Sequence, residues 1–257
     1  PAMRADDLAI DLPLPDEHPL APAIRYAEER CDYFRQNIRD YTCRLVKRER
    51  IGGVLQSYQY LDVKVRCEQV RDGETVHPLS VYLRYLAPKT HKGRQVLYVA
   101  GERDGRMLVR KGGRTLSSLT LRIALGSQLA LRESNYPITE IGFDRIVERL
   151  LKIAKQDIEH DPHAQNTEVT YLRNAQVGKR RCMHIKVDHP RQNPQLAFHQ
   201  ASLFIDNELR IPTRLVVRDW PANGIGGEPP IIEEYTYVNP RLNLGLTDAD
   251  FDESVFD

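Results

Sequence analysis

The histidines are the residues whose chemistry could bind a metal ion, because imidazole nitrogens and carboxylate oxygens are common zinc ligands. Six candidate ligands occur in the second half of the chain: His160, Asp161, His163, His184, His189 and His199. The first three belong to the segment EHDPHAQN, which is polar, interrupted by proline and typical of a solvated loop. No HExxH spacing places two of these side chains on one face of a helix. We therefore expect no metal site and no cofactor.

The sequence shows no pattern that would activate a nucleophile. GxSxG is absent, and the segment GSQLA that begins at Gly126 lacks the second glycine of a strained nucleophile turn. Glu233 and Glu234 are neighbours in an expected strand, so their carboxylates face opposite sides and cannot act together on one bond. We expect no catalytic residues, and an enzyme that uses a cleft is the last of our three hypotheses.

Charge gives little reason to expect binding to nucleic acid. The chain has 37 Lys and Arg against 36 Asp and Glu, a formal net charge of +1 in 257 residues. Two short basic clusters, Lys47–Arg50 and Lys179–Arg181, lie beside expected turns. We interpret them as solvated hairpin ends, with docking of an acidic partner or of lipid head groups as the alternative. No apolar run reaches the roughly 18 residues of a membrane-spanning helix, so we expect no transmembrane segment.

Alternating apolar and polar residues predict about ten short antiparallel strands. The clearest case is DVKVRCE (Asp62–Glu68), in which the apolar side chains Val63 and Val65 point one way and the charged ones point the other. The stretch SLFIDNELRIPTRLVV predicts a hairpin with its turn at Asp206 and Asn207, and Pro212 predicts a bulge or a missing hydrogen bond in the returning strand.

Two amphipathic helices are expected to cover this sheet. Apolar residues recur at three- and four-residue steps from Ile24 to Ile38, and again from Ile146 to Ala154 after a proposed N-cap at Thr139. The predicted fold is therefore α+β: a strongly curved antiparallel sheet, or half-open β-barrel, with helices packed over its concave face.

The boundaries of the domain follow from composition. Residues 1–20 contain four prolines and no sustained period, so we expect an extended N-terminal arm there. Residues 21–257 then form a single domain. The irregular, leucine-rich segment Thr115–Asn135 is a candidate lid. Cys31, Cys43, Cys67 and Cys182 show no CxxC pair and are expected to be buried, although disulfides stay open if the protein is exported.

A resemblance to a known family joins these features. YTCRLVKRERIGG, VYLRYLAPK and YPITEIGFDRIVERLL, with the hairpin ending in Trp220-Pro221 and the closing EEYTYVNPRLNLGLTDADFD, resemble a bacterial family of uncharacterised proteins. That family is placed with the outer-membrane lipoprotein carriers of the LolA/LolB type, and the resemblance spans roughly residues 24 to 252. It implies a half-open barrel with helices over its mouth and an exported, periplasmic or cell-envelope location, although no signal peptide is present in this chain.

Such folds hold acyl chains or other apolar ligands, so the expected ligand-binding residues are apolar positions on the inner face of the sheet. They are Val63, Val65, Val81, Leu83, Leu97, Val99, Leu203, Leu215 and Val217. Our first hypothesis is a non-enzymatic binding or carrier protein for lipid or lipoprotein acyl chains, with a possible envelope protein as partner. The alternative is a structural or interaction module of the envelope in which the same side chains simply fill the core and no ligand binds.

Overall fold

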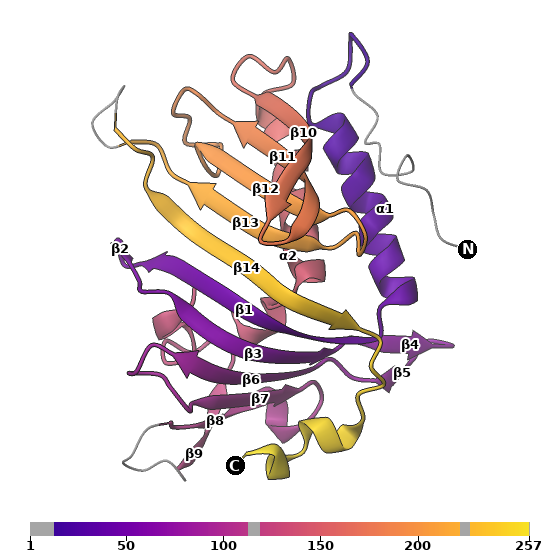
Figure 1. The fold of residues 1–257 in the computed structure, drawn as a ribbon, viewed down its shortest axis with the longest axis vertical. Helices are drawn as coiled ribbons and strands as arrows, with labels where there is room; N and C mark the ends of the chain where they lie inside the picture. Colours follow the sequence, from indigo (N-terminus) through magenta and orange to yellow (C-terminus); the bar gives the residue numbers. More distant parts are fainter. Residues whose placement is uncertain (1–12, 113–118, 222–226, 257) are drawn as a thin grey trace. The chain divides into compact units, whose positions relative to one another are not determined.

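The computed structural model describes residues 13–112, 119–221 and 227–256 (Figure 1). The described residues form two α-helices, α1 (Ala21–Asn37) and α2 (Phe143–His160). The strands are β1 (Asp40–Ile51), β2 (Val54–Leu55), β3 (Gln59–Arg66), β4 (Gln69–Arg71), β5 (Glu74–His77), β6 (Ser80–Ala87), β7 (Gln95–Val99), β8 (Arg106–Arg110), β9 (Thr120–Ala124), β10 (Glu168–Val177), β11 (Arg180–Asp188), β12 (Gln200–Asp206), β13 (Pro212–Arg218) and β14 (Ile231–Leu242).

Twelve of the strands form one mostly antiparallel sheet in the order β10-β11-β12-β13-β14-β1-β3-β6-β7-β8-β9, with β2 paired to β1. The end strands β10 and β9 are not paired with each other, so the sheet is open, and β4 and β5 form a separate hairpin. The predicted α+β fold with an open antiparallel sheet and two helices is confirmed. The ten expected strands are all present. Four further strands were not predicted as such: β2, β4 and β5 have only two to four residues, and β9, which buries only Ile123, lies in the segment expected to be irregular.

The chain divides into two compact units that are each discontinuous in sequence. Unit 1 contains the described residues up to Asp32 together with Phe143–Glu234, and unit 2 contains Tyr33–Gly142 and the residues from Tyr235 onward. The single domain expected for residues 21–257 stays a prediction. Residues 1–12 of the expected arm lie outside the described residues. Close to helix α1 the arm is attached to unit 1, because the Pro19 carbonyl accepts a hydrogen bond from Tyr171 Oη at 2.9 Å.

In unit 1 the register of β11, β12 and β13 gathers their apolar side chains on one face. Leu203 of β12 lies opposite Ile185 of β11 and Leu215 of β13, and Ala201 lies opposite Val187 and Val217. Helix α2 packs against β13. This helix begins at Phe143, so the N-cap expected at Thr139 is wrong: Thr139 lies in a separate 3-10 turn, Ile138–Glu140. The predicted apolar stripes of both helices are confirmed.

The β12–β13 hairpin has the predicted turn, and its register shifts between Phe204 and Ile205, opposite Pro212, as expected of a strand that lacks one N–H. The Asp206 carboxylate is fully buried at the turn. It accepts hydrogen bonds from the backbone amides of Glu208 and Leu209 at 2.8 and 2.9 Å and from Arg180 Nη2 at 2.9 Å. Asp206 therefore fixes the hairpin through its side chain as well as its backbone.

In unit 2 strands β6 and β7 bury side chains on both faces of the sheet. Val63 lies opposite Leu83, which lies opposite Val96, whereas Tyr82 lies opposite Leu97, which lies opposite Leu108. The second group forms a buried cluster with Val99 and with Phe251 of the C-terminal 3-10 turn Asp248–Phe251. The C-terminal segment therefore covers this face of unit 2.

The basic cluster Lys47–Arg50 is partly buried, so its interpretation as a solvated hairpin end is wrong for Lys47 and Glu49, which are 6% and 2% exposed. Lys47 Nζ lies 2.9 Å from Glu49 Oε1, and the same oxygen accepts a hydrogen bond from Tyr235 Oη at 2.7 Å. Glu49 Oε2 accepts another from the backbone amide of Asn135 at 2.6 Å. Sequence spacing could not reveal this network because its partners are distant in the chain.

The network holds the C-terminal end of the candidate lid, Thr115–Asn135, at Asn135. Residues 115–118 of that segment lie outside the described residues, and its role as a lid stays a prediction.

We expect Asp206→Asn to lower the free energy of unfolding at pH 7 by about 1–3 kcal/mol, because it weakens a buried charge-assisted network. Burial raises the pKa of Asp206, but the Arg180 guanidinium and the two amides outweigh it and hold the pKa below its ordinary value. The stability that the carboxylate supplies is thus present above about pH 4 and is lost as the pH falls through its lowered pKa.

The variant should therefore lose less stability than the parent protein as the pH falls from about 5 to about 2, the range in which carboxylates titrate. Urea unfolding over this range measures both effects. Glu208→Gln is the matched control, since Glu208 also binds Arg180 but its side chain is 85% exposed. Identical acid sensitivity in all three proteins would contradict the assignment.

Candidate functional site

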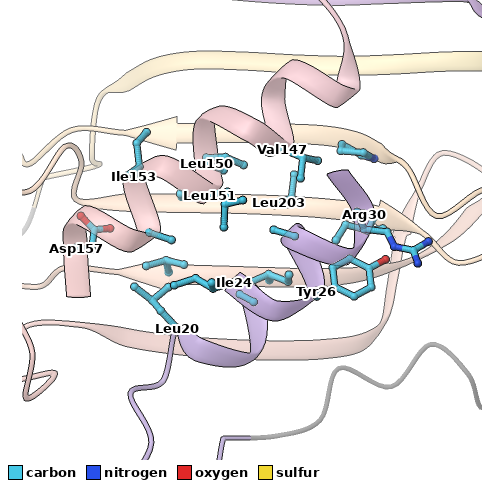
Figure 2. Close-up of a pocket in the computed structure, with 18 of the residues that line it drawn as sticks. Leu20, Ile24, Tyr26, Arg30, Val147, Leu150, Leu151, Ile153, Asp157 and Leu203 are labelled. Carbon is cyan, nitrogen blue, oxygen red and sulfur yellow. The ribbon is translucent and has the colours of Figure 1, made fainter. Parts of the chain in front are cut away.

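A pocket lies between the two helices and the sheet of unit 1 (Figure 2). Its lining from α1 and the residue before it is Leu20, Ala23, Ile24, Tyr26, Ala27 and Arg30; from α2 it is Val147, Leu150, Leu151, Ile153, Ala154 and Asp157; and from the sheet and its loops it is Ile185, Val187, Phe198, Ala201, Leu203, Ile205, Arg210 and Pro212. All but Tyr26, Arg30, Asp157 and Arg210 are apolar. The site is therefore a mostly apolar slot with a few polar side chains.

The space exists because short side chains stand where the helices face the sheet. Ala23 and Ala27 are four residues apart on α1, Ala154 lies on α2, and Ala201 lies on β12. The pocket has a volume of about 750 Å³, part of which is open to solvent, and water molecules could be centred in about 80 Å³ of it. The enclosed part of the slot is therefore narrow.

Asp157 and Leu20 mark one end of the slot in Figure 2, and Tyr26 and Arg30 mark the other. Leu20 and Arg30 are ten residues apart, which corresponds to about 15 Å along a helix. The pocket therefore has two chemically different ends.

At the first end the polar groups satisfy one another. Asp157 Oδ2 lies 3.3 Å from His189 Nε2, and both side chains are almost completely buried. His189 Nδ1 lies 3.1 Å from the Asn166 carbonyl, which can only accept a hydrogen bond, so Nδ1 carries a proton. The Asp157 and His189 side chains are therefore paired at this end of the slot.

The neighbouring carboxylate Asp161 completes that network. It accepts hydrogen bonds from Thr167 Oγ1 at 2.7 Å and from the backbone amides of Gln165 and Asn166 at 2.8 Å. Burial raises the pKa of Asp161, but these donors outweigh it and lower the pKa below its ordinary value. Burial also lowers the pKa of His18, whose Nε2 donates to the Asp161 carbonyl at 3.1 Å. The network therefore attaches the start of α1 to the end of α2.

At the second end the polar groups are less well matched. The Tyr26 hydroxyl is buried and has no hydrogen-bond partner among the described residues. The Arg30 guanidinium lies 5.5 Å from the centre of the Tyr26 ring, and Arg30 pairs with the exposed Glu29. Burial raises the pKa of Tyr26 to about 12, although the positive charges of Arg30 and Arg210 act to lower it. The hydroxyl is therefore a neutral donor at physiological pH.

Of the nine expected ligand-binding residues, Leu203 lines this pocket. Leu215 and Val217 are buried on the same face of the sheet by register. Val63, Val65, Val81 and Leu83 are buried on one face of unit 2, and Leu97 and Val99 are buried on the opposite face, beside Phe251. Ligand contact at these positions stays a prediction. The helix residues of the pocket were missed, although the alanines at Ala23 and Ala27 were a signal that could have found them.

The histidines proposed as metal ligands have other roles. His160 and His163 are exposed, His184 stacks on Phe204 with ring centres 4.2 Å apart, and His199 Nδ1 lies 2.9 Å from the His189 carbonyl. Within residues 13–112, 119–221 and 227–256, no group of three or more His, Cys, Asp or Glu side chains is placed to hold a metal ion. His184, His189 and His199 therefore act in packing and hydrogen bonding.

The other candidate groups are also explained by structure. Arg149 of α2 pairs with Glu233 at 2.9 Å and Arg214 of β13 pairs with Glu234 at 2.6 Å, so the two glutamates do face opposite sides of β14. The cysteines Cys31, Cys43 and Cys182 are buried, as expected, and Cys67 is half-buried. Burial raises the pKa of the Cys43 thiol to about 12. None of these groups is arranged as an activated nucleophile or an acid–base pair at the pocket.

Among the described residues, neither helix is both long and apolar enough to span a membrane.

Comparison with known proteins gives one family match. The family model described as "Protein of unknown function (DUF1571)" matches residues 38–255. No curated protein matches the chain. The expectation of an uncharacterised family is confirmed.

Several solved structures are distantly similar to the chain. A DUF1329 family protein from Desulfovibrio piger is 15% identical, with coverage of 93% of this chain and 99% of that one and a TM-score of 0.43. A putative outer membrane lipoprotein-sorting protein domain from Vibrio parahaemolyticus is 10% identical, with coverage of 91% and 97% and a TM-score of 0.40. A LolA superfamily protein from Nitrosomonas europaea is 11% identical, with coverage of 90% and 98% and a TM-score of 0.39.

We expect His189→Leu to lower the free energy of unfolding by about 3–5 kcal/mol, because it leaves the Asp157 carboxylate buried without its partner. The double variant Asp157→Leu/His189→Leu should lose less than the sum of the two single losses, since it removes the buried charge together with its partner. A double-mutant cycle measured by urea unfolding checks this. Strictly additive losses would show that the two side chains do not interact.

Proposed function

The chain belongs to the DUF1571 family of proteins of unknown function, and we propose that it binds an apolar ligand, such as a lipid or a lipoprotein acyl chain, in the pocket of unit 1. The observation that carries the proposal is the slot itself, which runs between α1, α2 and the sheet and is apolar at all but four positions. Burial of an alkyl chain gains about 0.8 kcal/mol for each CH₂. The protein would act as a non-enzymatic binding or carrier protein.

The size of the slot determines how a ligand would enter. Because water molecules could be centred in only about 80 Å³ of the pocket, a long chain needs α1 and α2 to separate slightly. The helices are held at the Asp157 end by the His18–Asp161 contact and, on the surface, by Lys155 Nζ and Glu28 Oε1 at 2.6 Å. The surface ion pair is more than 45% exposed on both sides and contributes little to stability. Opening at the other end therefore costs the fewest contacts.

We place this activity in the bacterial cell envelope, after export, with an envelope protein as the partner that delivers or receives the ligand. The support for this part of the proposal is the sequence resemblance to the LolA/LolB-type carriers.

The alternative is a structural or interaction module with a filled core. One observation favours it for unit 2, where Phe251 and the residues after it pack against Tyr82, Leu97 and Leu108 and leave that face covered by the chain itself. The two possibilities differ in unit 1, where the apolar slot either binds a ligand or is part of the core. Binding at the slot decides between them.

We expect Ala154→Leu to weaken binding of a neutral alkyl probe, dodecanol, by about tenfold, because the larger side chain fills the slot. The same change should raise the free energy of unfolding of the ligand-free protein by about 0.5–2 kcal/mol, as cavity-filling substitutions do. Titration calorimetry and urea unfolding measure the two effects. Gln156→Leu is the control, since it adds a similar side chain at an exposed position of the same helix.

Loss of stability in Ala154→Leu together with unchanged dodecanol binding would show that the slot is not the binding site. Failure of the parent protein to bind dodecanol would favour the filled-core module.

We also expect the protein purified from its bacterial source to carry lipid. Native mass spectrometry should show a bound mass that is lost after extraction with organic solvent. The lipid recovered in the extract should account for that mass. Ala154→Leu, prepared in the same way, should carry less of it than Gln156→Leu. If all three proteins had the mass of the ligand-free chain, this would count against a tightly bound lipid.

A further inference from the structure

The Tyr26 side chain lines the pocket, and its hydroxyl is a buried donor. It has no hydrogen-bond partner among the described residues, and its surroundings are apolar side chains and guanidinium groups. A buried hydroxyl left unpaired costs about 1–3 kcal/mol. Such a cost is offset if an acceptor arrives with a ligand. The hydroxyl therefore points to an oxygen or other acceptor at this end of the slot.

Arg210 adds a positive charge at the same end. It lines the pocket, and within the described part of the chain its guanidinium has no ion-pair partner. Its backbone lies in the left-handed region with φ of 56°, where glycine is favoured and other residues are strained. A strained backbone that holds a charged side chain at a pocket is a pattern seen at binding sites.

Arg30 increases this positive character. Its side chain is 5% exposed and lies over the Tyr26 ring, and its partner Glu29 has a side chain that is 67% exposed to water. Two arginines and one hydroxyl donor thus line this end of the pocket. Guanidinium groups bind carboxylates and phosphates with paired hydrogen bonds.

At the opposite end of the slot the polar side chains already have partners. Asp157 is paired with His189, and that histidine is bonded to the Asn166 carbonyl. A negatively charged group placed there would meet the Asp157 carboxylate, whereas an alkyl tail would meet Leu20, Ile24 and Ile153. The two ends of the slot therefore favour one orientation of an amphiphile.

We propose that the ligand is a single-chain amphiphile with an anionic oxygen head group, a carboxylate or a phosphate monoester, which is bound by the Tyr26 hydroxyl and the Arg30 and Arg210 guanidinium groups while the tail extends toward Asp157. This inference rests on the proposed function, because it assumes that the slot binds an alkyl chain. It adds the chemical class and the direction of the ligand.

The test compares alkyl probes of one length that differ only in the head group, used below their micelle concentrations. Dodecanoate and dodecyl phosphate should each bind at least about tenfold more tightly than dodecanol, and dodecyltrimethylammonium should bind most weakly. A preference between the two anions identifies carboxylate or phosphate as the natural head group. Titration calorimetry at neutral pH measures all four affinities.

Two variants assign the effect to named residues. Tyr26→Phe removes one oxygen and Arg210→Gly removes the charge while relieving the left-handed backbone, so neither should destabilise the ligand-free protein. Each should weaken binding of the two anions by about tenfold and leave dodecanol binding within about twofold of the parent value. Arg173→Gln, which removes an exposed positive charge of unit 1 outside the pocket, is the control and should change no affinity.

The outcomes separate the two proposals. Equal binding of dodecanol and the anions, unaffected by either variant, would overturn the head-group assignment and leave the apolar site intact. A uniform loss of anion binding in Arg173→Gln as well would also overturn it, since it would show adsorption to general positive charge. If no probe binds, the proposed function fails and the head-group inference fails with it.

Discussion

The structure of unit 1 depends on the need to cover one apolar sheet face. Strands β11, β12 and β13 alternate so that Ile185, Leu203 and Leu215 share a side, and such a face is stable in water only under another layer. The helices α1 and α2 supply that layer. They do so with alanines at Ala23 and Ala154, which cover the face without filling the space above it. A pocket is thus a consequence of how the cover is built.

The polar groups of the slot show how much such a cover can tolerate. At one end Asp157 and His189 are buried together, and their hydrogen bonds offset the loss of water. At the other end the Tyr26 hydroxyl is buried, and no acceptor lies beside it in the part of the chain that the structure describes. In an ordinary core, phenylalanine would pack equally well at this position without burying a hydroxyl. Its presence, beside two arginines, is most simply understood as a feature that serves binding rather than folding.

Sequence patterns predicted the fold better than the site, for a physical reason. Strand alternation is local, so the β12–β13 hairpin, its turn at Asp206 and the irregularity opposite Pro212 could all be expected from the sequence. The face to which a strand turns its side chains depends on register with its neighbours. This is why Leu97 and Val99 were grouped with Leu83, although register places them on the opposite face. The burial of Lys47 beside Glu49 likewise depends on Tyr235 and Ser134, which lie far from both in the sequence.

The two units illustrate different solutions to the same constraint. In unit 2 the face that carries Tyr82 and Leu97 is covered by the C-terminal segment, with Phe251 inserted into the cluster. That segment is fixed at its start by the Asp40 carboxylate, which accepts hydrogen bonds from the backbone amides of Leu244, Gly245 and Leu246. It is fixed again by Lys64 with Asp250 and by Arg66 with Asp248.

The C-terminal cover of unit 2 is thus held by many polar attachments. The helices over the slot in unit 1 face it mostly with apolar side chains, and contacts between such side chains have no fixed direction. Their polar attachments include His18 with Asp161 and Arg149 with Glu233. The sheet supplies an apolar face in both units, and the covering segment decides whether that face is core or pocket.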